Sequence, residues 1–194
     1  MTTTSRGPAA RLEKVDAPGA MLTTTAAKAL AVLRIALGFV FLWAFLDKLF
    51  GLGYATPSDR AWINGGSPTR GFLSGIDVGP FQDAFHSIAG SAWADWLFML
   101  GLAGLGVALI LGIGLRIAAA AGTVLLALMW LATFPPARFN SAGEATRSTD
   151  PIMDDHIIYA INTIVLALTY AGHTWGLGRQ WAQLPVVQRN PWLI

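Results

Sequence analysis

The sequence predicts an all-α integral membrane protein, a bundle of four transmembrane helices with both termini in the cytoplasm. Three observations support this fold class. Hydrophobic residues make up 54% of the 194 residues and charged residues only 12%, against about 25% charged residues in an average protein domain. Four apolar segments approach the length of about 20 residues that a helix needs to cross a bilayer. The basic residues gather on one side of these segments.

The four spans are expected over residues 29–50, 93–111, 115–134 and 155–172. Backbone amides find no water inside hydrocarbon, so such segments must be helical. Together they form a transmembrane domain over residues 29–178. Residues 1–28 are rich in Thr, Ala and Pro, which predicts a disordered cytoplasmic tail. Residues 179–194 form a cytoplasmic C-terminal tail.

The distribution of charge predicts the orientation. An even number of spans puts both termini on one side, and that side holds eight basic residues against Glu13 and Asp16. The opposite side holds five basic residues against nine acids. Because basic residues favour the cytoplasmic side, a multi-pass protein of the cell membrane with cytoplasmic termini is expected. The eight basic residues include Arg34, which we expect to snorkel to the cytoplasm.

The connections between spans carry two further predictions. Only Gly112–Gly114 separates the second span from the third, which predicts an antiparallel hairpin. Small residues at four-residue spacing would let these two helices approach closely; they are Gly104, Ala108, Gly112, Ala118 and Gly122. In the first outer loop, apolar residues at helical spacing over Pro80–Gly90 predict a short amphipathic helix at the interface.

The composition also excludes several functions. The chain has no cysteine, so disulfides, thiolate metal sites and a thiol relay within the chain are ruled out. No metal, haem or iron–sulfur motif is indicated. The basic residues form no run with interleaved aromatics, so nucleic acid is not an expected partner. The lipid bilayer is the main expected partner.

The stretch "DPIMDDH" at residues 150–156 opens an apolar span with three carboxylates and a histidine. Asp47 and Lys48 lie about 27 Å along the first span from Ala29, near its outer edge. We therefore expect these two residues to share one membrane depth with Asp155, His156 and Asp95. Each acid alone also fits a structural role, since acids near a helix start cap it and complement its dipole.

The positions of the polar residues on their helix faces favour a site. Asp155, Tyr159 and Asn162 form one stripe that runs into the membrane, and such a stripe should face the bundle. Trp43 lies on the face of Asp47 in the first span. A histidine beside carboxylates can exchange protons near neutral pH. Aromatic rings such as Trp43, Trp93 and Trp130 could bind a flat ring, although such residues also form interfacial belts without ligands.

Taken together, the segments resemble the DoxX/DoxD family of four-helix membrane proteins. The resemblance rests on "LRIALGFVFLWAFLDKLFG" in the first span, "WINGGSPTRGFL" in the outer loop, "GLGVALILGIGLRIAAAAGTVLLALMW" across the hairpin, "DPIMDDHIIYA" at the fourth span and "WGLGRQW" after it. The family includes the quinone-reactive membrane subunit of thiosulfate:quinone oxidoreductase. The resemblance therefore implies a quinone-linked redox subunit, working with thiosulfate and a second redox subunit.

On this interpretation a quinone headgroup binds at the outer mouth between spans one and four. His156 is then the proton donor, with Asp155 and Asp47 as further catalytic residues. Lys48, Trp43, Tyr159 and Asn162 would bind the quinone. Two alternatives stay open: a non-catalytic membrane partner of a redox or oxidative-stress complex, and an oligomeric transporter.

Overall fold

The computed structural model describes residues 23–146 and 148–194, and this part of the chain is helical apart from turns and one bridge between Phe139 and Ala145. Three helices are long and apolar enough to cross a membrane. They are α1 (Thr24–Phe50), α4 (Ala92–Leu111) and α5 (Leu115–Thr133). The chain is thus an all-helical membrane protein, compatible with a bundle.

The start of α1 differs from the prediction. The helix begins five residues before residue 29, because the hydroxyl of Thr23 accepts a hydrogen bond from the amide of Ala26 at 3.2 Å and so caps it. Residues 24–28 are therefore helical and do not belong to an irregular tail. The rest of the predicted N-terminal tail, residues 1–22, lies outside the described residues.

The fourth apolar helix is shorter than predicted. α6 (Asp155–Leu168) has 14 residues, which corresponds to about 21 Å against a hydrocarbon core of about 30 Å. It ends four residues early, because Tyr170 adopts a left-handed backbone conformation with φ of 53° and turns the chain into η4 (Ala171–His173). A fourth full span therefore stays a prediction.

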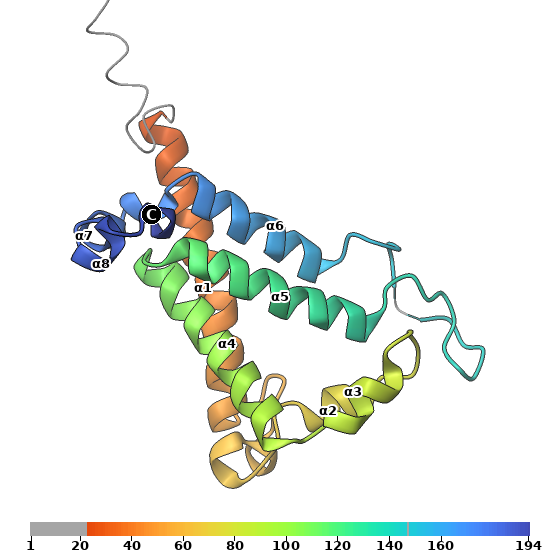
Figure 1. Cartoon of the computed structure of the whole chain (residues 1–194). Coiled ribbons are helices and arrows are strands. Elements are labelled where there is room, and N and C mark those ends of the chain that lie inside the picture. Colours follow the sequence, from red (N-terminus) through yellow and green to blue (C-terminus); the bar gives the residue numbers. More distant parts are fainter. Residues whose placement is uncertain (1–22, 147) are drawn as a thin grey trace, which may run out of the picture.

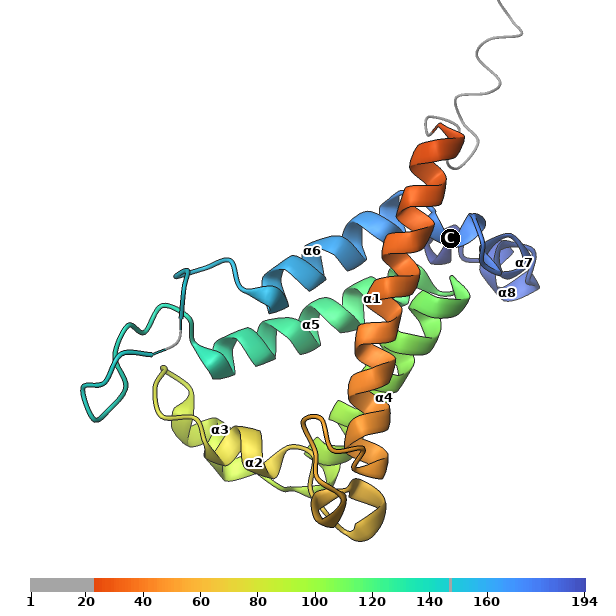
Figure 2. The same ribbon diagram turned by 180° about the vertical axis from the view of Figure 1, so that it is seen from behind.

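The helices pack as two pairs, which meet near the C-terminal residues and diverge toward the long loops (Figures 1 and 2). α1 packs along α4, and α5 packs along α6. We call the end with the C-terminal residues the terminal end, and the end with segments 51–91 and 134–154 the loop end. Short helices of the first loop lie between the two pairs at the loop end; they are α2 (Arg70–Ser74) and α3 (Gln82–Ile88).

Helix α3 confirms the short helix predicted within residues 80–90. The remaining short elements are η2 (Ser58–Arg60), η3 (Trp62–Asn64), α7 (Gly178–Ala182), α8 (Pro185–Gln188) and η5 (Pro191–Leu193). The last three fold the predicted C-terminal tail into a cap at the terminal end, where Val187 is fully buried.

The small residues of α4 allow a close approach to α1, whereas the sequence predicted a close approach to α5. A methyl group added at Gly106 would lie 2.7 Å from the backbone nitrogen of Leu42, so α4 makes its closest approach to α1. Gly104, which we predicted to face α5, has no atom within 4 Å of such a group. The predicted contact survives at Gly122 of α5, where the added group would meet the side chain of Leu105 at 2.7 Å.

Arg34 joins the two pairs at the terminal end and does not snorkel. Its side chain is fully buried, and the guanidinium donates to carbonyls of α4 and of the segment after α6. Nη1 donates to Leu109 and Ile110, the latter at 2.8 Å. Nε donates to Ala171, and Nη2 donates to Thr174 and Trp175.

Two glycines make room for this guanidinium. A methyl group at Gly112 or at Gly176 would lie 3.0 Å from a nitrogen of Arg34. Gly112 also has a φ of 71°, which ends α4 and turns its last carbonyls toward Arg34. Two carbonyls at the end of α4, those of Leu109 and Ile110, thus receive hydrogen bonds from α1.

Candidate functional site

A polar cavity of about 620 Å³ lies at the loop end, where α5 ends and α6 begins. Its volume falls within the range of about 300–1,000 Å³ that small-molecule sites occupy. The wall comes from the C-terminal end of α5, the connecting segment and the first turns of α6. The polar or charged side chains that line it are Thr133, Thr146, Ser148, Thr149, Asp150, Asp154, Asp155, His156 and Tyr159.

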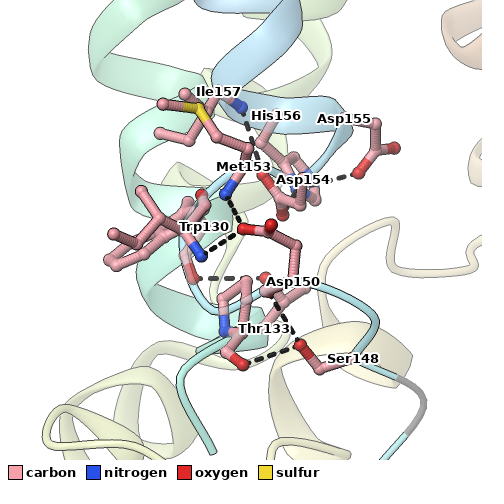
Figure 3. A network of polar contacts seen from close by, with 11 residues as sticks. Trp130, Thr133, Ser148, Asp150, Met153, Asp154, Asp155, His156 and Ile157 are labelled. Atoms are coloured by element: carbon pink, nitrogen blue, oxygen red, sulfur yellow. Dashed lines mark hydrogen bonds and ion pairs between the residues drawn. The ribbon is translucent and has the colours of Figure 1, made fainter.

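His156 is the central titratable group of this cavity. Its Nδ1 lies 2.7 Å from Oδ2 of Asp154 and 3.4 Å from Oδ1 of Asp155. The side chains of His156 and Asp154 are 13% and 19% exposed, whereas Asp155 is 67% exposed. The closer and better buried carboxylate therefore orients the imidazole, and Figure 3 shows this pair at the start of α6.

Asp154 is also the N-cap of α6. Its Oδ1 accepts a hydrogen bond from the amide of Ile157 at 3.1 Å, while Oδ2 faces His156. One carboxylate thus fixes both the helix start and the imidazole two residues later. With Nδ1 directed at Asp154, Nε2 of His156 is the ring nitrogen left for a ligand.

The segment before α6 is held by its own hydrogen bonds (Figure 3). Oδ1 of Asp150 accepts from the amides of Ile152 and Met153 at 2.8 and 2.6 Å. These two donors lower the pKa of Asp150 below its ordinary value. The hydroxyl of Ser148 donates to the carbonyl of Pro135, and Nε1 of Trp130 donates to that of Ile152 at 2.9 Å. The wall of the cavity is thereby tied to α5.

The structure brings three of the predicted site residues together. His156, Asp155 and Tyr159 line the polar cavity. Tyr159 also packs edge-on against Phe41 of α1, with ring centroids 6.0 Å apart. Asn162 does not line the cavity, and its amide donates to the carbonyl of Ile158 in its own helix at 2.9 Å.

The other three predicted residues lie on α1, in the other pair of helices. The predicted cluster of Asp47 and Lys48 with His156 does not form, because the two pairs diverge at the loop end (Figures 1 and 2). Asp47 is 2% exposed and accepts from the amides of Tyr54 and Ala55 at 3.2 and 3.0 Å. Lys48 lies 5.9 Å from the ring of Phe98, and Trp43 packs edge-on against Tyr54.

Asp95 likewise serves the first loop and not the cavity. Its Oδ1 accepts from the hydroxyl of Ser67 and from the amide and hydroxyl of Thr69, at 2.9, 3.0 and 2.6 Å. The carboxylate is 6% exposed. These bonds hold the segment before α2 against the start of α4.

Sequence reasoning undervalued Asp154 and the loop residues. The position of Asp154 before an apolar helix predicts an N-cap, which the structure has. The sequence pattern gives no sign of the second contact, between Asp154 and His156. Ser148 and Asp150 could be found only as turn formers. Asp154, Asp155 and His156 place one potential ligand atom each within 4.8 Å of one another, but both oxygens of Asp154 already have partners within the chain.

The comparison with known families gives a match to the DoxX family model over residues 29–134, more than half of the chain. The chain belongs to the DoxX family. The DoxX match covers α1 to α5, with Arg34, Asp47 and Asp95, and ends at the first residue beyond α5. No curated protein and no solved structure matches the chain significantly. Family membership therefore supports the membrane scaffold, while the polar cavity rests on its own geometry.

Proposed function

We propose that this DoxX protein is a quinone-binding subunit of a redox system in the cell membrane, and that the quinone headgroup enters the polar cavity beside His156. The observation that carries the proposal is the imidazole held by Asp154 inside a cavity of about 620 Å³. A quinone headgroup is a flat ring with two acceptor oxygens. The chemistry of the wall fits it, because His156 and the hydroxyl of Tyr159 can donate to such oxygens.

Reduction of a quinone to a quinol takes up two electrons and two protons. His156 supplies a proton through Nε2, and the carboxylate of Asp154 orients the ring for that transfer through Nδ1. Asp155, the most exposed member of the cluster, returns a proton from the aqueous side. Asp47 has no direct part in this step, since its oxygens hold the amides of Tyr54 and Ala55.

Thiosulfate is the proposed electron donor. Two thiosulfate ions join through one new sulfur–sulfur bond to give tetrathionate, and they release the two electrons that the quinone takes up. The chain has no cysteine, so electrons pass directly from thiosulfate to the bound quinone or through a second subunit. The excess of basic residues on the side of the chain termini supports an outer position for the cavity. Arg138, which follows the lining residue Ala137, would attract the anion.

The isoprenoid tail of a quinone also needs an apolar surface. A second cavity, of about 300 Å³ and lined almost entirely by apolar side chains, lies between α2, α3, α4 and α5. Ala132 lines this apolar cavity, and its neighbours Thr133 and Phe134 line the polar one. The tail would therefore pass around the end of α5, with the headgroup at His156.

One observation favours the alternative function of a non-catalytic membrane partner. Asp47, Asp95 and Asp154 each accept hydrogen bonds that hold a loop or a helix start. On that interpretation the acids stabilise a scaffold that presents its loop end to a redox enzyme. A His156→Gln change would then leave every redox rate intact.

The test is thiosulfate-dependent quinol formation in proteoliposomes and, in parallel, in membranes that contain the chain's natural partners. We expect His156→Gln to slow the wild-type rate by about 100-fold. His86→Gln is the matched control, since His86 lies on α3 and bonds the carbonyl of Ile76. Equal rates for both variants and the wild type, or no reduction in either preparation, would contradict the proposal.

A further inference from the structure

A second polar cavity, of about 350 Å³, lies at the terminal end, at the opposite end of α6 from His156. It is formed by the first turns of α1 and by the segment that follows α6. Figures 1 and 2 show the first turns of α1 extending beyond the end of α6. The cavity thus opens beside an exposed helix start.

The charged side chains that line this cavity are all basic. Lys28 and Arg179 are exposed and flank it, and no ion pair joins either of them to an acid in the described part of the chain. His173 also lines the cavity. Burial and the neighbouring Arg179 lower the pKa of His173, so at neutral pH its ring is uncharged and carries one N–H donor.

The neutral groups of the wall also favour an anion. The start of α1 places amides without helical partners and the positive end of the helix dipole beside Lys28. Thr24 and Thr174 line the cavity, and each carries a hydroxyl that can donate a hydrogen bond. Arg116 stands behind the wall, 3.3 Å from the hydroxyl of Tyr170, and adds a further positive charge.

We infer that this cavity binds a phosphate group between Lys28 and Arg179, with Thr24, Thr174 and His173 as neutral donors. The best source is the headgroup of an anionic phospholipid, because the cavity sits at the start of α1, a helix long and apolar enough to cross a membrane. Free inorganic phosphate shares the recognised chemistry. The inference is independent of quinone binding, since the two cavities share no residue.

Lys28 and Arg179 could also have a purely structural role that involves no phosphate. Cations near the end of a helix also stabilise its free carbonyls, and Lys28 and Arg179 lie near the C-terminal end of α6. That role requires no ligand. Binding measurements distinguish the two roles because only a phosphate site prefers an anionic headgroup.

The experiment uses the purified full chain in a neutral detergent. Native mass spectrometry measures retention of phosphatidylglycerol against phosphatidylcholine, and equilibrium dialysis measures binding of inorganic phosphate. The test variant is Lys28→Gln with Arg179→Gln. The matched control, Arg60→Gln with Arg138→Gln, removes the same charge from two exposed residues at the loop end. Thr174→Val keeps every charge and removes one hydroxyl.

We expect wild-type protein and the control to retain phosphatidylglycerol preferentially, and the test variant to lose that preference by about tenfold or more. Thr174→Val should weaken it by about threefold. Phosphate binding that is lost in the same variants would identify a general phosphate site, and retention of the lipid alone would identify a lipid site. Equal retention of both lipids, or equal losses in the test and control variants, with no phosphate bound would overturn the inference.

Discussion

Nδ1 of His156 lies 2.7 Å from Oδ2 of Asp154, whose other oxygen caps α6. The two roles of Asp154 can be separated by mutation, because asparagine caps a helix about as well as aspartate does. Asp154→Asn should therefore keep the stability of α6 and remove the negative charge of the carboxylate that lies beside the imidazole. We expect quinone reduction to slow by about tenfold, because a neutral amide holds the imidazole less firmly than the carboxylate does.

The measurement is the rate of quinone reduction, with the melting temperature as a second readout. Asp154→Ala serves as comparison, since it should lose the same interaction and also about 1 kcal/mol of capping. If Asp154→Asn reduces quinone as fast as the wild type does, Asp154 acts only as a helix cap.

Arg34 offers a test of the scaffold. Its five N–H groups all face carbonyls, so replacement by methionine leaves buried acceptors at the end of α4 without donors. We expect Arg34→Met to lower the free energy of unfolding by about 2 kcal/mol or more. Thermal unfolding in detergent checks this, with the exposed Arg189→Met as the control. A lysine at position 34 should not restore stability, because an ammonium cannot reproduce the guanidinium fork.

Asp95 provides a local test at the loop end. Asp95→Ala removes the acceptor for the amide and hydroxyl of Thr69, which should free the segment before α2. We expect faster hydrogen exchange over residues 62–75 and a loss of about 1–3 kcal/mol in stability. Asp83→Ala, an exposed acid on α3, is the control. Unchanged exchange over this segment would show that other contacts hold the loop.

The lowered pKa of Asp150 predicts a pH effect on stability. Its folded pKa lies below the ordinary value of 3.8 because the amides of Ile152 and Met153 bond the carboxylate. The stabilisation is therefore fully present above the ordinary value and is lost as pH falls through the lower, folded value. The melting temperature of wild type should exceed that of Asp150→Asn at neutral pH, and this difference should shrink below about pH 4. An equal difference in melting temperature at all pH values would contradict this prediction. Asp59→Asn is the control for removing an acidic charge elsewhere in the chain.

The sequence predicts the helices well and their pairing poorly. Continuous apolar segments fix α1, α4 and α5 to within a few residues, because the bilayer sets their length. The hydropathy pattern could not reveal that α4 packs against α1. That contact depends on Gly38 and Gly106, where two backbones meet, and not on the predicted Gly104.

The candidate site likewise could be predicted within one helix but not between helices. The opening of α6 predicts a polar cluster with Asp155, His156 and Tyr159, because they are neighbours on one helix. Equal depth along the helix axes suggested that Asp47 and Lys48 would join them. Depth fixes the position of a residue along the helix axis only and not its position across the bundle. The two helix pairs diverge at the loop end, so residues on α1 lie apart from those on α6 (Figure 1). Arg34 escaped prediction since its acceptors are backbone carbonyls from distant segments, which leave no signature in side-chain types.

The central claim is that the polar cavity beside His156 holds a quinone headgroup. The most direct measurement is cross-linking with a photoreactive quinone analogue, mapped by mass spectrometry in the purified full chain. We predict labelling within residues 133–159, competition by excess unlabelled quinone, and a loss of about tenfold in His156→Gln. Labelling confined to other segments, or labelling that excess quinone does not reduce, would contradict the account.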